Sequence, residues 1–401
     1  MKKISFYAVL AVATLASVSC SSDDVLVQSP SVNQPIEFGA YTGRSAALAP
    51  TRAHSVESTE TLAADGGFGV FAYYTNDVDY SQDATPNFMY NQQVTSDDNG
   101  VNWGYSPLKY WPNDRTDRLT FFAYAPYANH STDGDNFAFT TSTTTGDPKV
   151  TFTVNNDVKK QQDLLWSNSE TDNIIKNTTD GVSVTYKTLF TFQHALSRIG
   201  FTVKAITDEV DAGDPAKKLD AATTIVLREV RLTSGTVDGN TAPTGTPFYT
   251  TGTLNLNNRT NVALWSSQDG GQYFTLNNDD FEAQSGVQYD GEGYVLHNEN
   301  TIEANKLNTN DSYIMIIPQN FVGTGFNVYV EYDVITVDSN LHAGKTIVTN
   351  HISTPVKINF ESGKAYLLNL QLGMTSVKVA ASVANWENAN NTYVDLPQNQ
   401  N

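Results

Sequence analysis

The fold class is decided by the stretch Tyr366-Leu-Leu-Asn-Leu-Gln-Leu372, in which side chains of two kinds alternate. Tyr366 and every second residue after it are apolar, whereas Asn369 and Gln371 are polar. Successive side chains of a β-strand point to opposite faces, so this pattern predicts a strand with one buried face and one solvated face.

The same alternation recurs along the chain, and clusters of Asn, Asp and Gly separate the alternating runs. Further alternating runs are Phe201–Ala205, Val328–Val334 and Val377–Val383. Clusters typical of turns occupy residues 97–100, 133–136 and 277–280. No long stretch has the 3.6-residue period of a helix. The pattern therefore predicts an all-β protein made of antiparallel β-sandwiches.

Composition narrows the class of protein further. The chain has 401 residues, of which 39% are hydrophobic, so it can build packed cores in two or three domains. It carries 24 Lys plus Arg against 43 Asp plus Glu, a net charge of -19. We find no basic patch to offset this charge, so nucleic acid is not an expected partner. A single Cys excludes an internal disulfide and a Cys-rich zinc site.

Two β-sandwich domains are expected, covering residues 36–190 and 191–401. Between them, the run 190–198 places Phe190, Phe192, His194 and Leu196 on one face of a strand. A short helix through Leu189, Phe192 and Leu196 is the alternative interpretation of this run.

The N-terminus has the features of an export signal. Two Lys precede an apolar run at 4–18 that is too short to span a bilayer, and small residues lead into Cys20. Residues 15–20 resemble a bacterial lipobox, which implies a signal peptide at 1–19 and lipid attachment to Cys20. Ordinary secretion without a lipid is the alternative.

The polar stretch 20–35 is expected to be a flexible tether because it holds little apolar surface. Its acidic start, Ser21-Ser-Asp-Asp24, resembles the surface-export signal of Bacteroidales lipoproteins. The two resemblances imply a lipid-anchored protein on the outer face of the outer membrane.

Short motifs spread along the mature chain resemble those of the fimbrillin family, the lipoprotein-derived fimbrial subunits and adhesins of Bacteroidales. These motifs are Ile36–Thr42, Thr51–Ala53, Gly67–Tyr74, Tyr110–Asn113 with Leu119–Pro126, Phe192–Arg198, and Gly363–Tyr366 leading to Trp386. The resemblance implies a transthyretin-like topology for both sandwiches and a lipidated precursor. It also implies assembly with other fimbrial subunits after an Arg-specific protease removes the N-terminal segment.

The implied assembly mechanism needs a strand that can be displaced. A sandwich that lacks one strand leaves an apolar groove with unpaired backbone groups, which a donated strand can fill. Ile36, Phe38 and Ala40 alternate as such a strand requires. A cut after Arg52, which makes Ala53 the new N-terminus, would free this strand; Arg44 is the second candidate.

The donor end of the chain is less favourable for polymerisation. After Trp386 the tail is short and polar, and Thr392–Leu396 is its one strand-like run. A stalk subunit, a tip or accessory adhesin, and an unpolymerised surface lipoprotein all stay open.

No catalytic, cofactor or metal motif stands out. The six His do not have the spacing of His-Glu-x-x-His, and neither a Gly-x-Ser-x-Gly nucleophile motif nor a phosphate-binding loop occurs. His194, between Phe192 and Leu196, is interpreted as a packing residue. We therefore expect a protein that is not an enzyme.

A group of aromatic residues offers a second function, binding to host or bacterial surface glycans or proteins. Exposed rings beside Asn and Asp would suit a carbohydrate-binding lipoprotein that does not polymerise, whereas buried rings would belong to the core. The rings in question are Trp103, Tyr105, Tyr110, Trp111, Tyr124 and Tyr127.

Overall fold

The structure is a computed structural model that describes the parts of the chain on which the fold depends. The described residues are 34–42, 56, 58–114, 116–129, 137–175, 187–206, 222–233, 248–271, 273–281, 293–296, 305–306, 313–386 and 394–396. Cys20, Arg44, Arg52 and Ala53 lie outside them, as does the expected signal peptide. Among the described helices, none has the length and apolar character needed to cross a membrane.

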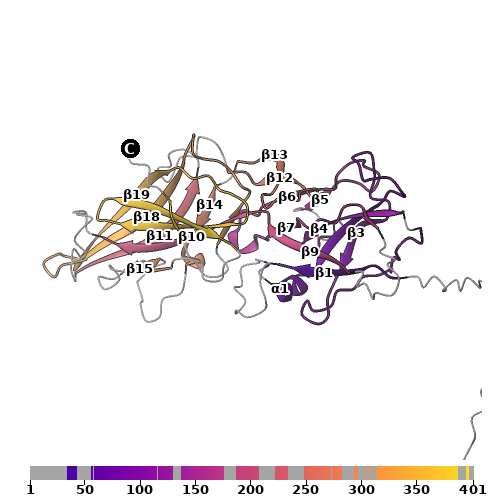
Figure 1. Ribbon diagram of the computed structural model, residues 1–401. Helices are drawn as coiled ribbons and strands as arrows, with labels where there is room; N and C mark the ends of the chain where they lie inside the picture. Colours follow the sequence, from indigo (N-terminus) through magenta and orange to yellow (C-terminus); the bar gives the residue numbers. More distant parts are fainter. Residues whose placement is uncertain are drawn as a thin grey trace, which may run out of the picture.

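Two sheets form the half of the molecule that carries the N-terminal strands (Figure 1). The seven-stranded sheet has the order β1 (Glu37–Tyr41), β9 (Lys187–His194), β7 (Leu165–Ser167), β4 (Arg118–Ala125), β2 (Phe68–Tyr74), β3 (Met89–Val94), with β8 (Ile174–Ile175) beside β4. The four-stranded sheet has the order β13 (Trp265–Asp269), β12 (Thr251–Asn255), β6 (Lys149–Thr153), β5 (Phe137–Phe139).

Two further sheets form the other half. The six-stranded sheet has the order β16 (Asn305–Lys306), β10 (Ser197–Ala205), β20 (Lys364–Leu372), β21 (Val377–Asn385), β22 (Val394–Asp395), with β17 (Ile314–Ile316) beside β10. The five-stranded sheet has the order β14 (Phe274–Leu276), β11 (Thr223–Thr233), β18 (Phe326–Val337), β19 (Lys345–Val356), with β15 (Tyr294–Leu296) beside β11. Short helices are α1 (Thr59–Ala64), η1 (Val158–Lys160) and η2 (Asn278–Asp280).

The predicted all-β class is confirmed, and the alternating runs quoted above lie in β10, β18, β20 and β21. Most strand pairs are antiparallel, as expected. Two pairs are parallel instead: β1 with β9, and β10 with β20. Parallel partners need long connections, which period-2 patterns do not reveal. The transthyretin-like topology stays a prediction.

The run 190–198 is extended, not helical. Strand β9 ends at His194 and β10 begins at Ser197, and the inward side chains Phe190, Phe192, His194 and Leu196 are buried as the strand interpretation requires.

Strand pairing crosses the predicted boundary at 190/191. Strand β12 pairs with β6, and the hydroxyl pairs Thr151–Thr253 and Thr153–Thr251 are 3.0 and 3.2 Å apart. Figure 1 shows β12 and β13 beside β5 and β6. The two expected domains thus share one sheet, and the exact boundary stays a prediction.

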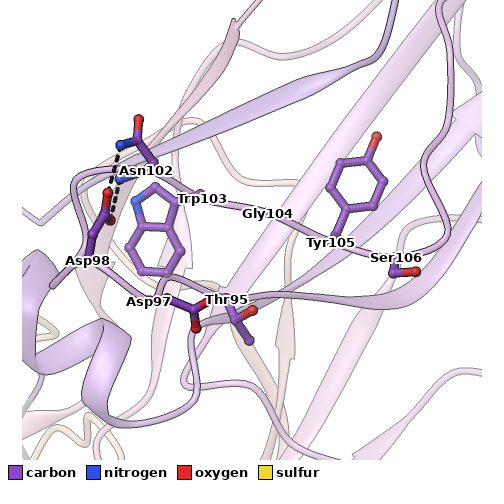
Figure 2. A pocket seen from close by; sticks show the side chains of 8 residues that line it. All are labelled: Thr95, Asp97, Asp98, Asn102, Trp103, Gly104, Tyr105 and Ser106. Atoms are coloured by element: carbon purple, nitrogen blue, oxygen red, sulfur yellow. Dashed lines mark hydrogen bonds between the residues drawn. The ribbon is translucent and has the colours of Figure 1, made fainter.

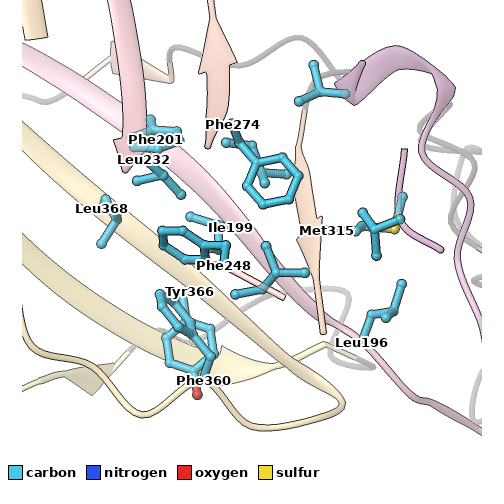
Figure 3. Close-up of a cluster of buried hydrophobic side chains, with 14 of the residues drawn as sticks. Leu196, Ile199, Phe201, Leu232, Phe248, Phe274, Met315, Phe360, Tyr366 and Leu368 are labelled. Atoms are coloured by element: carbon cyan, nitrogen blue, oxygen red, sulfur yellow. The ribbon is translucent and has the colours of Figure 1, made fainter. Parts of the chain in front are cut away.

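One apolar core extends through both halves. It begins at Phe71 and Phe122, continues through Leu254 of β12, and reaches Trp386 after β21. Figure 3 shows its part around β10 and β20, where Tyr366 and Phe360 meet edge to face with ring centroids 4.8 Å apart. Continuous packing of this kind couples the stability of the two halves.

A buried His–Asp pair lies where β9 leads into β10. His194 Nδ1 lies 2.8 Å from Asp163 Oδ2, and both side chains are shielded from solvent. The imidazole stacks on the Trp386 ring at 4.3 Å between centroids. This agrees with the interpretation of His194 as a packing residue.

The shared core predicts that the halves unfold together. Leu254 is fully buried, so Leu254→Ala should lower the free energy of unfolding by about 2–5 kcal/mol. The nearby Leu264→Ala is the control, because that side chain is 54% exposed. Urea unfolding followed by circular dichroism should show one transition, shifted in Leu254→Ala alone. Two separate transitions, with one of them unshifted, would contradict the shared core.

Candidate functional site: the slot that holds β1

Strand β1 lies between two neighbours, although it ends the strand order of its sheet. On one side it runs parallel to β9, with Phe38 opposite Thr188. On the other side the segment 103–111 runs antiparallel to it, with bridges from Pro35 to Tyr110 and from Phe38 to Trp103. We call the space between β9 and the segment 103–111 the slot.

Hydrogen bonds fix β1 to the segment 103–111. The Ile36 amide donates to the carbonyl oxygen of Lys109 at 2.9 Å, and the Trp111 amide donates to that of Gln34 at 3.0 Å. The Tyr105 hydroxyl donates to the Ile36 carbonyl oxygen at 2.9 Å, and burial is the main cause that raises the pKa of Tyr105. Pairing therefore begins at Gln34, within the stretch expected to be tether.

The segment 103–111 also closes the sheet on itself. Thr95, directly after β3, exchanges backbone hydrogen bonds of 2.9 and 2.8 Å with Gly104. Trp103 then bridges to Phe38, so the strand order returns from β3 to β1. Removing β1 would open this ring of strands and leave backbone groups on both walls of the slot unpaired.

Aromatic rings form the floor of the slot. Phe38 is 1% exposed, and its ring centroid lies 5.2 Å from Tyr105, 5.7 Å from Phe121 and 5.6 Å from Phe190. Ile36 is buried equally well, whereas Ala40 is half-buried. Burial of two large apolar side chains stabilises β1 by about 3–6 kcal/mol on transfer scales.

Three of the six aromatic residues singled out in the sequence, Trp103, Tyr105 and Trp111, belong to the packing around this slot. Trp103 lies 5.0 Å from Phe68, and Trp111 lies 6.1 Å from Phe121, between ring centroids. Tyr124 is fully buried and Tyr127 is half-buried, whereas Tyr110 is exposed. The rings near β1 thus serve the core more than they serve an open binding face.

A polar cleft of about 500 Å³ lies beside the slot (Figure 2). It is lined by Thr95, Asp97, Asp98 and residues 102–106. In it, Asp98 Oδ1 accepts the Asn102 amide at 2.7 Å and the Ser96 hydroxyl at 2.8 Å, and Oδ2 accepts Asn102 Nδ2 at 2.6 Å. The backbone hydrogen bond from Asn102 is the main cause that lowers the pKa of Asp98 to about 2. These bonds fix the turn that leads into Trp103.

The chain is anchored again soon after the expected cleavage point. Val56 is buried, and its amide donates to Asp163 Oδ2 at 3.1 Å, the same oxygen that contacts His194. Arg44, Arg52 and Ala53 fall between Thr42 and Val56, outside the described residues. The candidate cut therefore separates two anchored parts of the chain, β1 and the body from Val56 onward.

In the described part of the chain, no three His, Cys, Asp or Glu side chains gather as they would to ligate a metal ion.

The sequence model of the family described as fimbrillin-like matches residues 51–386. The chain belongs to the fimbrillin-like family. The fimbrium subunit Fim1C of Phocaeicola vulgatus is 26% identical over 405 residues, covering 96% of this chain and 98% of that protein. A crystal structure of a fimbrial protein from Bacteroides vulgatus aligns with a TM-score of 0.66 at 24% identity, over 88% of this chain and 100% of that chain. The family resemblance found in the motifs is confirmed.

Sequence reasoning located β1 but missed both of its walls. The alternation at Ile36 and Phe38 marks the strand, whereas nothing local indicates that β9 runs parallel to it or that Lys109 accepts a hydrogen bond from it. Asp163 was missed as well, because its bond to Val56 joins residues 107 positions apart.

The slot predicts that truncation of two different side chains of β1 will have very different effects on the free energy of unfolding. Phe38→Ala should lower the free energy of unfolding of the protein by about 3–5 kcal/mol, because it empties the space between three rings. Tyr41→Ala should change it by less than about 0.5 kcal/mol, because Tyr41 is 47% exposed. Urea unfolding of both variants measures the difference. Equal effects would mean that β1 rests on the surface without filling a slot.

The lowered pKa of Asp98 predicts that the stability contributed by its turn depends on pH in the acid range. Its pKa falls from 3.8 to about 2 on folding, so its stabilising contribution is complete above 3.8 and is lost as pH falls through 2. Asp98→Asn lacks this titration. The melting temperature of the wild type should exceed that of Asp98→Asn at neutral pH, and the gap should shrink below pH 3.8. A gap independent of pH would contradict the role of the carboxylate.

Proposed function

We propose that this chain is a surface-exposed lipoprotein that acts as a fimbrial subunit or adhesin and joins other subunits by donor-strand exchange. The family supports a fimbrial role, and the contacts of β1 support the exchange. The observation that carries the proposal is the placement of β1 between two walls, with Ile36 and Phe38 buried beneath it.

The proposed first step is a cut after Arg52 by an Arg-specific protease, with Arg44 as the second candidate. The cut would leave β1 held by noncovalent contacts alone, while Val56 stays fixed by Asp163. A partner's strand with apolar side chains at alternate positions would then replace Ile36 and Phe38. Because it would restore both the backbone bonds and the apolar contacts, the exchange is close to neutral in free energy before the partner's other contacts are added.

The proposed location is the outer membrane before assembly and the fimbrium afterwards. A lipid attached to Cys20 would anchor the precursor, because two or more acyl chains at about 0.8 kcal/mol per buried methylene hold a protein stably. The expected partners are other fimbrial subunits and the membrane, and the net charge of -19 disfavours nucleic acid.

The pairing of the C-terminal tail bears on which position this subunit would take within a fimbria. Strand β22 pairs with β21, and the Leu396 amide donates to the Ala381 carbonyl oxygen at 2.8 Å. A tail that pairs with its own sheet must be released before it can be donated. This supports a chain that accepts a strand more readily than it donates one, as a tip or accessory subunit does.

The alternative function, a carbohydrate-binding lipoprotein that does not polymerise, has weaker support. Trp103 and Tyr105 are the rings nearest the polar cleft, and both pack into the floor and walls of the slot.

Limited digestion with an Arg-specific protease tests the proposal. Mass spectrometry should show one cut after Arg52, with Ala53 as the new N-terminus, and sizing should then show higher oligomers. Arg52→Ala should block both results, whereas Arg44→Ala should not.

A peptide control makes the test specific to the slot. An excess of a peptide with the sequence of residues 34–42 should suppress the oligomers, and the same peptide with Phe38→Ala should not. Resistance to the protease at both Arg44 and Arg52, or oligomers that ignore the peptide, would overturn the proposal.

A further inference from the structure

The edge strand β19 is covered in its second half and open in its first half. From Asn350 onward it lies against the corner between β20 and β21: Asn350 Nδ2 donates to the Met374 carbonyl oxygen at 3.0 Å. The Thr354 hydroxyl donates to the Val377 carbonyl oxygen at 3.2 Å. Before Asn350, the residues Thr346–Thr349 pair with β18 and with no other strand in the described part of the chain.

The open half has unusual side chains for an edge. Natural sheets protect a free edge with charges, Pro or bulges, because unpaired backbone groups attract other strands. Here the open part begins with Lys345 and continues as Thr346-Ile-Val-Thr349, four β-branched residues without charge. All four are exposed, with Ile347 at 46% and Val348 at 50%, and Val337 at the end of β18 is 60% exposed. The segment therefore combines strong strand propensity and apolar surface with backbone groups that, among the described strands, only β18 pairs on one side.

The distribution of charge also favours this segment for contact between two molecules. Two copies of a chain with net charge -19 repel each other over most of their surface. Thr346–Thr349 contains no acidic residue, and Asp333, which faces Thr349 from β18, is paired with Arg228 at 2.6 Å. This edge is thus a place where two acidic molecules can approach without facing carboxylates.

We propose that β19 of one molecule pairs antiparallel with β19 of a second copy of this chain, through Thr346–Thr349. In an antiparallel pair, facing residues both turn their backbone groups toward the seam or both turn them away. A two-fold axis through Ile347 satisfies this rule: Ile347 faces Ile347 of the second copy, and Thr346 faces Val348. The same edge then supplies both partners, with β-branched side chains opposite each other and no like charges.

This association is separate from strand exchange at the slot. Figure 1 shows β19 and β1 in opposite halves of the molecule, so pairing at β19 leaves β1 in place. It requires no proteolytic cut, and in a fimbria it would join subunits side by side.

Sedimentation of the uncleaved full chain, in a Cys20→Ser background, tests the proposal. The wild-type edge should give a monomer–dimer equilibrium that shifts toward the dimer with added salt, because salt screens the repulsion between copies. Ile347→Lys should abolish the dimer, since it places two like charges together on the axis. Val262→Lys is the matched control, because Val262 is 66% exposed elsewhere on the surface.

Disulfide cross-linking gives an independent readout of the register. Facing residues have Cα atoms about 4.5–5.5 Å apart, within the range that a disulfide can bridge. Ile347→Cys should therefore form a covalent dimer under mild oxidation, and Val262→Cys should not. A monomer at every concentration, a dimer that survives Ile347→Lys, or equal cross-linking of both Cys variants would overturn the proposal.

Discussion

The structure of the N-terminal half depends on one contact, the insertion of the Phe38 ring among Tyr105, Phe121 and Phe190. This ring is carried by a strand that precedes the rest of the sheet in sequence and yet completes it in space. Backbone bonds on both sides of β1 make the strand part of a closed ring, and the next described residue after Thr42, Val56, is fixed to the body by Asp163. A strand so placed stabilises the sheet and can still be removed without threading the chain.

The remainder of the molecule is held together more firmly than two linked domains would be. Strand β12, which follows residue 191 in the sequence, belongs to the four-stranded sheet of the N-terminal half, and His194 at the end of β9 stacks on Trp386, directly after β21. Because β9 is also a wall of the slot, the strand that borders β1 is fixed to the core of both halves. Loss of β1 should therefore leave the rest of this half folded, which the proposed strand exchange requires.

Much of the architecture could be predicted from local patterns, and what could not be predicted depends on distant partners. Alternation in Tyr366–Leu372 identified a strand, and Ile36 with Phe38 identified β1. Period-2 patterns say which face is buried but not which strand lies alongside, so the parallel pairing with β9 was missed. The family was recognised from scattered motifs, whereas the roles of Cys20 and Arg52 stay predictions because they lie outside the described residues.

Amide hydrogen exchange measured by mass spectrometry on the intact chain and on the chain cut after Arg52 tests the central claim most directly. Once the N-terminal fragment has been washed away, amides of β9 and of the segment 103–111 should lose protection, while those of β18 keep theirs. A partner strand, or the fragment itself, should restore the protection. Unchanged exchange in β9 and the segment 103–111 after β1 has gone would contradict this claim, because β1 would then not pair with the backbone groups on either side of it.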